Sequence, residues 1–156
     1  MKQELLIGIT ESGVMHTDAD PPIPLDTKFQ MVKESGVYDY FDKTPPLELE
    51  DDYRRCSEKY ELPILAGGFF YVLGRDEDLL MENLRLGARL GSLVHNTQII
   101  MDHQDGSLVS DEQVVEIYLR AYETGEACGC RPTFEVHVNM WSEDFRRIEK
   151  VADLVE

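Results

Sequence analysis

Residues 134–144 read FEVHVNMWSED, and polar and apolar side chains alternate strictly over most of this stretch. Side chains two positions apart share one face of a β-strand. One face of such a strand would be wholly apolar, while the other would carry the carboxylate, imidazole and amide of Glu135, His137 and Asn139. A half-exposed strand, apolar inside and polar outside, shows the same pattern. The surrounding sequence must show whether this is an ordinary half-exposed strand or a strand that carries functional side chains.

Apolar, β-branched runs alternate with amphipathic segments along the whole chain. Strands are expected over residues 4–10, 37–41, 62–70, 92–101 and 132–140. Helices are expected over residues 25–36, 47–60, 76–91 and 110–122, and from Ser142 onward. Strands that alternate with helices indicate parallel pairing through right-handed crossovers. The chain is therefore predicted to be a single α/β domain over residues 1–156, with no linker.

Several helix ends carry recognisable capping residues. Gly36 and Gly91 lie where a helix C-terminus favours glycine. Ser110 and Gln113 form a capping box of the S-x-x-Q type. Ser142 is expected to cap the last helix, with two acidic residues following it in the first turn.

Two architectures fit this order of elements. A chain of 156 residues suits a complete flavodoxin-like, doubly wound sheet of five strands. The strand faces favour part of a closed (β/α)8 barrel, because helices cover both faces of central strands in a doubly wound sheet and make them apolar. The fifth expected strand has one polar face instead. The fourth contains His95, Asn96, Thr97 and Gln98, a pattern that suits barrel strands whose carboxyl ends build an active site.

The overall composition narrows the classes of partner and compartment. The chain has 31 Asp and Glu against 15 Lys and Arg, a formal charge of −16. This charge repels phosphate backbones and anionic lipids, so neither nucleic acid nor membrane is an expected partner. No apolar run is long enough to span a bilayer, and the N-terminus does not read as a secretory signal. Cys56, Cys128 and Cys130 are predicted to be reduced thiols, which favours the cytoplasm.

The usual nucleotide and nucleophile motifs are missing. The sequence contains no G-x-G-x-x-G after the first strand, no G-x-x-x-x-G-K-[ST] and no G-x-S-x-G. Carboxylate and imidazole groups at strand ends are what remains for chemistry. Glu135 is a candidate metal ligand with His137 two residues on, and His95 lies on the preceding strand, whereas His16 and His103 are interpreted as surface residues.

Four segments together resemble a known family. They are GVYDYFDKTP (36–45), LPILAGGFFYVLG (62–74), LGARLGSLVHNTQI (86–99) and PTFEVHVNMWSEDFRRIEKVADLV (132–155). In order and character they resemble the xylose isomerase-like (β/α)8 barrels, also called TIM barrels. That superfamily includes sugar isomerases, ketose 3-epimerases, inosose dehydratases and metal-dependent abasic-site endonucleases. The resemblance implies that the chain is the N-terminal part of such a barrel, with five of its β/α units.

The resemblance also implies site residues and a cofactor. In the family, the fifth strand ends with a Glu that binds a divalent metal, and Glu135 matches it. The other ligands usually come from the sixth to eighth strands, so further ligands for Mn²⁺, Mg²⁺, Co²⁺ or Zn²⁺ are expected outside this chain. Glu135 would also be catalytic, as a proton carrier. His95, His137, Asn139 and Trp141 are expected to contact the substrate.

The implied function is a metal-dependent isomerase or epimerase of a small sugar or sugar phosphate, acting by enediolate proton transfer. A dehydratase on the same scaffold is one alternative. A non-catalytic barrel fragment or subunit that self-associates is another. The expected partners are a sugar-like small molecule and either further copies of the chain or the rest of the barrel. The sequence leaves open which sugar, which metal and which of these reactions applies.

Overall fold

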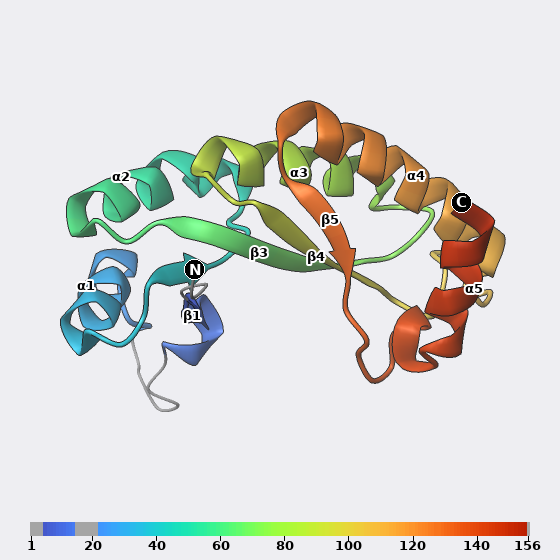
Figure 1. The fold of residues 1–156 in the computed structure, drawn as a ribbon, viewed down its shortest axis with the longest axis horizontal. Helices are drawn as coiled ribbons and strands as arrows, with labels where there is room; N and C mark the ends of the chain where they lie inside the picture. Colours follow the sequence, from blue (N-terminus) through green and yellow to red (C-terminus); the bar gives the residue numbers. More distant parts are fainter. Residues whose placement is uncertain (1–4, 15–21, 156) are drawn as a thin grey trace.

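A computed structural model describes residues 5–14 and 22–155 of the chain. Its centre is one sheet of five parallel strands (Figure 1). The strands are β1 (Gly8–Thr10), β2 (Tyr40–Asp42), β3 (Ile64–Tyr71), β4 (Val94–Ile99) and β5 (Arg131–Phe134). Their order across the sheet is β1-β2-β3-β4-β5, so each strand pairs with its neighbours in the sequence.

Helices α1 to α4 connect consecutive strands, and α5 follows β5. The α-helices are α1 (Leu25–Ser35), α2 (Glu50–Tyr60), α3 (Glu77–Leu90), α4 (Asp111–Cys128) and α5 (Arg146–Val155). Short 3₁₀ turns occur at η1 (Glu11–Gly13), η2 (Leu47–Leu49) and η3 (Trp141–Glu143). Helices α2, α3 and α4 form an arc along one side of the sheet (Figure 1). None of the helices within the described ranges is long and apolar enough to cross a membrane.

The strand order decides between the two expected architectures. A flavodoxin-like sheet would place the first strand between the second and the third. The observed sequential order is that of a (β/α)8 barrel, in which every right-handed crossover advances the sheet by one strand in the same direction. The partial TIM-barrel prediction is therefore confirmed, and the doubly wound alternative is wrong.

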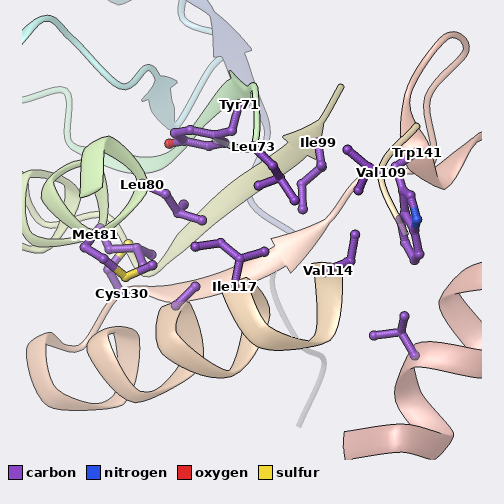
Figure 2. Packing of buried hydrophobic residues seen from close by; sticks show 13 residues of the cluster. Tyr71, Leu73, Leu80, Met81, Ile99, Val109, Val114, Ile117, Cys130 and Trp141 are labelled. Atoms are coloured by element: carbon purple, nitrogen blue, oxygen red, sulfur yellow. The ribbon is translucent and has the colours of Figure 1, made fainter. Parts of the chain in front are cut away.

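Two hydrophobic clusters hold the helices against the strands. The first joins β3, β4 and β5 to α3, α4 and α5, and includes Tyr71, Leu84, Ile99, Val114 and Ile117 (Figure 2). The second joins β1, β2 and the start of β3 to α1 and α2. Helices α1 to α4 thus bury their apolar faces against the strands that they connect, as barrel units do, and α5 packs beside α4.

Burial alternates along β4 and shows which way its side chains point. His95, Thr97 and Ile99 are buried, while Val94, Asn96 and Gln98 keep some exposure. The buried set lies on the side of the helices, since Ile99 belongs to the first cluster. Asn96 and Gln98 therefore point to the opposite, inner face of the sheet.

The fifth strand is much shorter than its alternating pattern predicts. It ends at Phe134 rather than at residue 140, so the prediction of a continuous strand over 132–140 is wrong beyond that point. Asn139 has a left-handed φ of 63°, which breaks the extended conformation. Met140 then forms an isolated antiparallel bridge with Ile100. The chain thus turns back toward the end of β4 instead of extending the parallel pairing.

Ser142 does not cap the last helix, contrary to the sequence prediction. It lies within η3, and its hydroxyl donates a hydrogen bond to the carbonyl of Glu135. The helix begins at Arg146, where the Asp144 carboxylate accepts a bond from the Arg146 amide at 3.1 Å. A tertiary contact to the Glu135 backbone has therefore displaced the expected local cap.

Other local predictions are confirmed. Ser110 and Gln113 form a complete capping box at the start of α4. Gly36 and Gly91 end α1 and α3 in the left-handed conformation. The three cysteines are free thiols.

The first two strands differ from their predicted ranges. Both are shorter than the expected 4–10 and 37–41. Residue 4 and His16 lie outside the described ranges.

Candidate functional site

A pocket of about 430 Å³ lies at the carboxyl ends of the strands. Every strand of the sheet, or the residue that follows it, contributes to the lining. These contributions include Thr10, Asp42, Gly68, Phe70, Asn96, Gln98 and Glu135. In barrel enzymes of this type the active site is built at this end of the strands. The pocket is therefore the candidate site.

Glu135 lies immediately after β5, and two amides hold its carboxylate. Its backbone N–H donates to the carbonyl of Thr97 at 3.3 Å, which continues the pairing with β4 by one residue. Its Oε2 accepts a hydrogen bond from Asn96 Nδ2 at 2.6 Å and another from Gln98 Nε2. Both donors come from the inner face of β4. The carboxylate is thus fixed at the pocket, with Oε1 accepting no hydrogen bond from the described residues.

Gly68 lets the strands approach closely beside this carboxylate. It pairs with Asn96 across β3 and β4. A Cβ atom at this position would lie 3.0 Å from Asn96 Cβ and 3.1 Å from its carbonyl oxygen, closer than side chains normally pack. The glycine therefore leaves room for the Asn96 side chain that positions Glu135.

Asp42 is a second carboxylate of the pocket, at the last position of β2. Burial raises the pKa of Asp42, and the negative charge of Glu135 raises it further. Sequence reasoning missed this residue. The available signal was its place directly after a short apolar run, because the last residues of parallel strands gather at one edge of the sheet.

Glu11 follows β1 and carries the most extensive set of polar contacts at the pocket. Its carboxylate accepts bonds from Lys28 Nζ at 2.6 Å and from the Tyr53 hydroxyl at 2.8 Å. Lys43 Nζ lies 2.9 Å from its Oε2. Burial alone would raise the pKa of Glu11, but the hydrogen bonds from Lys28, Lys43 and Tyr53 outweigh it and lower that pKa to about 2. This residue was also missed from the sequence.

His137 and Asn139 lie in the irregular segment after β5, not on a strand face with Glu135. The His137 Nδ1 atom is 2.8 Å from the carbonyl oxygen of Val138, and its ring packs in a T-shaped arrangement with that of Phe70, with 6.1 Å between centroids. Asn139 is exposed, and its backbone N–H donates to Glu143. The structure therefore places His137 beside an aromatic ring that lines the pocket, whereas Asn139 does not line the pocket.

His95 is buried on the helix side of β4, away from Asn96 and Glu135. Its Nε2 is 2.6 Å from the Tyr71 hydroxyl and its Nδ1 is 3.2 Å from the Thr44 hydroxyl. The Tyr71 hydroxyl also accepts a bond from Asn83. Burial lowers the pKa of His95 to about 4. The imidazole thus lies in a neutral network behind the sheet, and among the described residues its hydrogen-bond partner Thr44 joins it to the pocket lining.

Trp141 is also buried in the core. It belongs to the cluster that Figure 2 shows, beside Val109. Its ring lies 5.9 Å from that of Phe134, and the Arg147 guanidinium lies 4.7 Å from its centroid. The indole Nε1 has no hydrogen-bond partner among the described residues. Of the five residues predicted from the sequence, the structure places only Glu135 in the pocket lining and His137 against it.

The described residues do not by themselves form a metal centre. Within residues 5–14 and 22–155, no three His, Cys, Asp or Glu side chains are grouped so that they could hold an ion. Glu135 and Asp42 are the inner-face carboxylates at the ends of β5 and β2. A stable divalent site needs more ligands than these two groups supply. A divalent cation therefore does not fit this part of the chain alone.

Comparison with known proteins yields matches only among solved structures. No protein-family model matches the sequence, and no curated protein matches it. An AP endonuclease of family 2 from Brucella melitensis superposes with a TM-score of 0.69 at 11% identity, covering 94% of this chain and 65% of the other. The 3-keto-D-glucoside 4-epimerase YcjR from E. coli gives 0.67 at 12% identity, covering 96% and 65%.

The IolI protein, solved with a bound zinc atom, gives a TM-score of 0.64 at 15% identity. The match covers 97% of this chain and 59% of IolI. The chain therefore spans 59 to 65% of the length of these three proteins. These likenesses confirm the resemblance to the xylose isomerase-like barrels at the level of the fold.

Proposed function

We propose that this chain supplies five β/α units of a barrel enzyme that isomerises or epimerises a small polyhydroxy carbonyl compound. The observation that carries the proposal is the Glu135 carboxylate, which two amides of β4 hold at a pocket on the carboxyl end of the sheet. The similarity of the fold to a 3-keto-D-glucoside 4-epimerase supports it. The proposal concerns the whole enzyme, of which the chain forms one part.

The proposed reaction requires a group that removes a proton from the carbon next to a carbonyl. Isomerisation and epimerisation both remove a proton from a carbon beside the carbonyl and return one, through an enediolate. A carboxylate within hydrogen-bond reach can act as the base. Asn96 and Gln98 both donate to Oε2 of Glu135, so its Oε1 is the oxygen that can accept the proton. Asp42 has a raised pKa and is better suited to return a proton.

A divalent cation remains part of the proposal, although the described residues cannot hold it alone. IolI, which shares the fold, was solved with zinc. Such a cation would polarise the substrate carbonyl and make the neighbouring C–H more acidic. We propose Glu135 as one of its ligands and expect the others outside this chain. The proton transfer assigned to Glu135 and Asp42 uses their own carboxyl groups.

Calorimetric titration with Mn²⁺ and with neutral ketoses tests this function on the full chain. Wild-type protein is expected to bind a ketose, and Glu135→Gln is expected to weaken that binding at least about tenfold by removing the fixed carboxylate. Glu149→Gln is the matched control, because Glu149 is exposed on α5 and loses the same charge. Mn²⁺ binding that depends on Glu135 would add support for the ligand role.

Two results would replace the proposal. Loss of water from the bound compound, seen by NMR, would favour the dehydratase interpretation. Absence of ketose binding would favour a non-catalytic barrel subunit, whereas absence of Mn²⁺ binding alone is expected of a chain whose described residues lack the other ligands. Equal binding by wild type and Glu135→Gln would contradict the role of Glu135.

A further inference from the structure

Glu11 joins four elements at the β1–β2 end of the pocket. It follows β1 in η1, and its carboxylate contacts Lys28 of α1, Lys43 after β2 and Tyr53 of α2. The contacts are short, at 2.6 Å, 2.9 Å and 2.8 Å. Lys43 and Glu11 both line the pocket. The ammonium group of Lys43 therefore reaches the pocket already paired with a carboxylate.

The ion pairs of Glu11 with Lys28 and Lys43 are partly buried, so water screens them poorly. The side chains of Glu11 and Lys28 are only 15% and 18% exposed, and that of Lys43 is 34% exposed. The lowered pKa of Glu11 keeps its carboxylate ionised at every physiological pH. Charges at such distances interact strongly when they are partly buried. Lys43 is thus neutralised and held, instead of being available to an anionic ligand.

The remaining charges at the pocket are also unfavourable for anions. Among the described residues, the acidic and basic groups in and around it are Glu11, Asp42 and Glu135 against Lys28 and Lys43. The pKa of Asp42 is raised, and even when Asp42 carries a proton the two lysines are balanced by two carboxylates. A phosphate ester would add up to two negative charges to a site whose ammonium groups are already matched by carboxylates. Coulomb repulsion from the carboxylates would oppose its entry, and no unpaired cation among the described lining residues would compensate.

The uncharged lining groups suit a neutral polyol. Thr10 and Ser12 carry hydroxyls 3.0 Å apart, and both line the pocket. Phe70 is 45% exposed and offers an apolar ring to the C–H face of a sugar. Gln98 adds a buried Oε1 that accepts no hydrogen bond from the described residues. Hydroxyl, amide and aromatic groups of this kind orient small polar ligands.

We infer that Glu11 selects between neutral and phosphorylated substrates. By neutralising Lys43, it makes the pocket bind an uncharged polyhydroxy carbonyl compound in preference to the phosphate ester of that compound. The inference rests on the proposed function and goes beyond it by naming the substrate class and the residue that selects it. Glu11 acts through Lys43 and is a specificity-determining residue, not a catalytic one.

Calorimetry with a panel of neutral ketohexoses and the corresponding 6-phosphates tests the inference on the full chain. Wild-type protein is expected to bind a neutral ketohexose at least about tenfold more tightly than its phosphate. Glu11→Gln frees Lys43 and removes one negative charge, so it is expected to gain phosphate-ester binding by at least about tenfold. The double variant Glu11→Gln/Lys43→Met is expected to lose that gain.

Asp26→Asn is the matched control for the lost charge. Asp26 also accepts bonds from a lysine and a tyrosine, Lys59 and Tyr60, but on the outer surface of α1 and α2. It is expected to keep the wild-type ratio between neutral and phosphorylated sugars. A gain of phosphate binding in this control would show that overall charge, and not Glu11, sets the selectivity.

The outcomes separate the inference from the proposed function. If wild-type protein binds phosphate esters as tightly as neutral sugars, the inference is wrong while the proposed function stands. If it binds neither kind of sugar, the proposed function is wrong and the inference falls with it. The wild-type ratio decides these cases even if circular dichroism shows that Glu11→Gln does not fold.

Discussion

The imidazole of His95 is buried behind β4 with each ring nitrogen near a neutral hydroxyl. A neutral ring can donate from one nitrogen and accept at the other, so Thr44 and Tyr71 satisfy it without a charge. Protonation would place a cation in the core without a counter-charge. Burial therefore lowers the pKa of His95 to about 4. The unfolded chain binds a proton at His95 more readily than the folded chain does.

This difference predicts an acid-sensitive stability. Because the folded-state pKa is depressed, the contribution of His95 is complete above its unfolded pKa of about 6.5 and is lost as the pH falls toward about 4. Between about pH 7.5 and about pH 4.5, wild-type protein is expected to lose about 2 kcal/mol more of its unfolding free energy than His95→Gln loses. Urea unfolding at the two pH values measures this. Parallel losses in the two proteins would contradict the neutral, buried histidine.

At the scale of single residues, the sequence predicts Glu135 as a site residue but not the contacts that hold it. Its role stays a prediction, whereas its place at the pocket follows from the strand end and from two amides of β4. Alternation in the sequence also grouped His137 and Asn139 with it. A turn at a left-handed Asn139 separates them, and no pattern of residue types shows that turn in advance.

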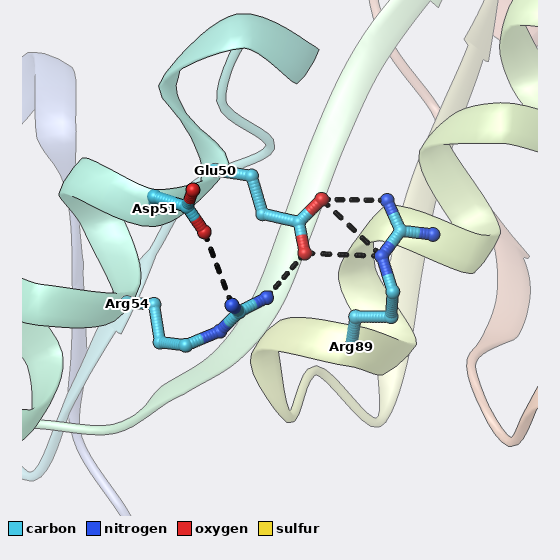
Figure 3. Close-up of polar contacts among 4 residues, drawn as sticks. All are labelled: Glu50, Asp51, Arg54 and Arg89. Atoms are coloured by element: carbon cyan, nitrogen blue, oxygen red, sulfur yellow. Dashed lines mark hydrogen bonds and ion pairs between the residues drawn. The ribbon is translucent and has the colours of Figure 1, made fainter.

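Between elements, helices α2 and α3 are joined by an ion network centred on Glu50 (Figure 3). Arg89 of α3 donates from Nη2 to Oε2 of Glu50 at 2.7 Å and from Nε to Oε1 at 3.0 Å. Arg54, one turn along α2, contacts the same carboxylate and also Asp51. The Glu50 side chain is only 17% exposed, so its two-point contact with Arg89 is less screened than an ordinary surface pair.

Breaking this network is expected to weaken the α2–α3 contact by a small, salt-dependent amount. Arg89→Met should lower the unfolding free energy by about 1 kcal/mol at low salt, and by less at about 1 M NaCl. Denaturant unfolding at both salt concentrations measures the effect. Arg55→Met is the control, because the Arg55 and Asp52 side chains are 69% and 46% exposed, and the loss of this surface pair should change little. A loss that is equal at both salt concentrations would point to packing of the arginine stem instead.

The ends of the helices show what local sequence signals can predict. The capping box of α4 and the glycines that end α1 and α3 act over a few residues, so their prediction is confirmed. Ser142 carries an equally good local signal, but its hydroxyl bonds the Glu135 carbonyl seven residues away. Glu11 and Asp42 become pocket residues only through the parallel sheet. Helix ends are thus readable from the sequence, while groups assembled from several strands are not.

For the whole molecule, the decisive feature is the sequential order of the strands. Within the described residues, β1 and β5 each pair with one neighbouring strand, and both leave an open edge. Apolar side chains are exposed near these edges and between them, including Leu6, Ile7, Leu93, Val136 and Val138. Unpaired strand edges and exposed apolar side chains both favour association with another chain or segment. The formal charge of −16 opposes association of identical copies at low salt.

These opposing forces predict association that depends on both concentration and salt. We expect the chain alone to be mostly monomeric when dilute at low salt, and to associate reversibly as salt screens its charge. Analytical ultracentrifugation over a range of protein concentrations, at about 0.05 M and about 0.5 M NaCl, measures this.

Val136→Lys/Val138→Lys places two cations beside the β5 edge, where the wild-type side chains are 56% and 58% exposed. The variant should associate less at high salt, because charged side chains at an edge discourage strand pairing. Leu154→Lys, an exposed change on α5, should associate like wild type if the edge is the contact. A wild-type chain that stays monomeric at every concentration and salt would show that the open edges are sufficiently protected by their own charge and twist.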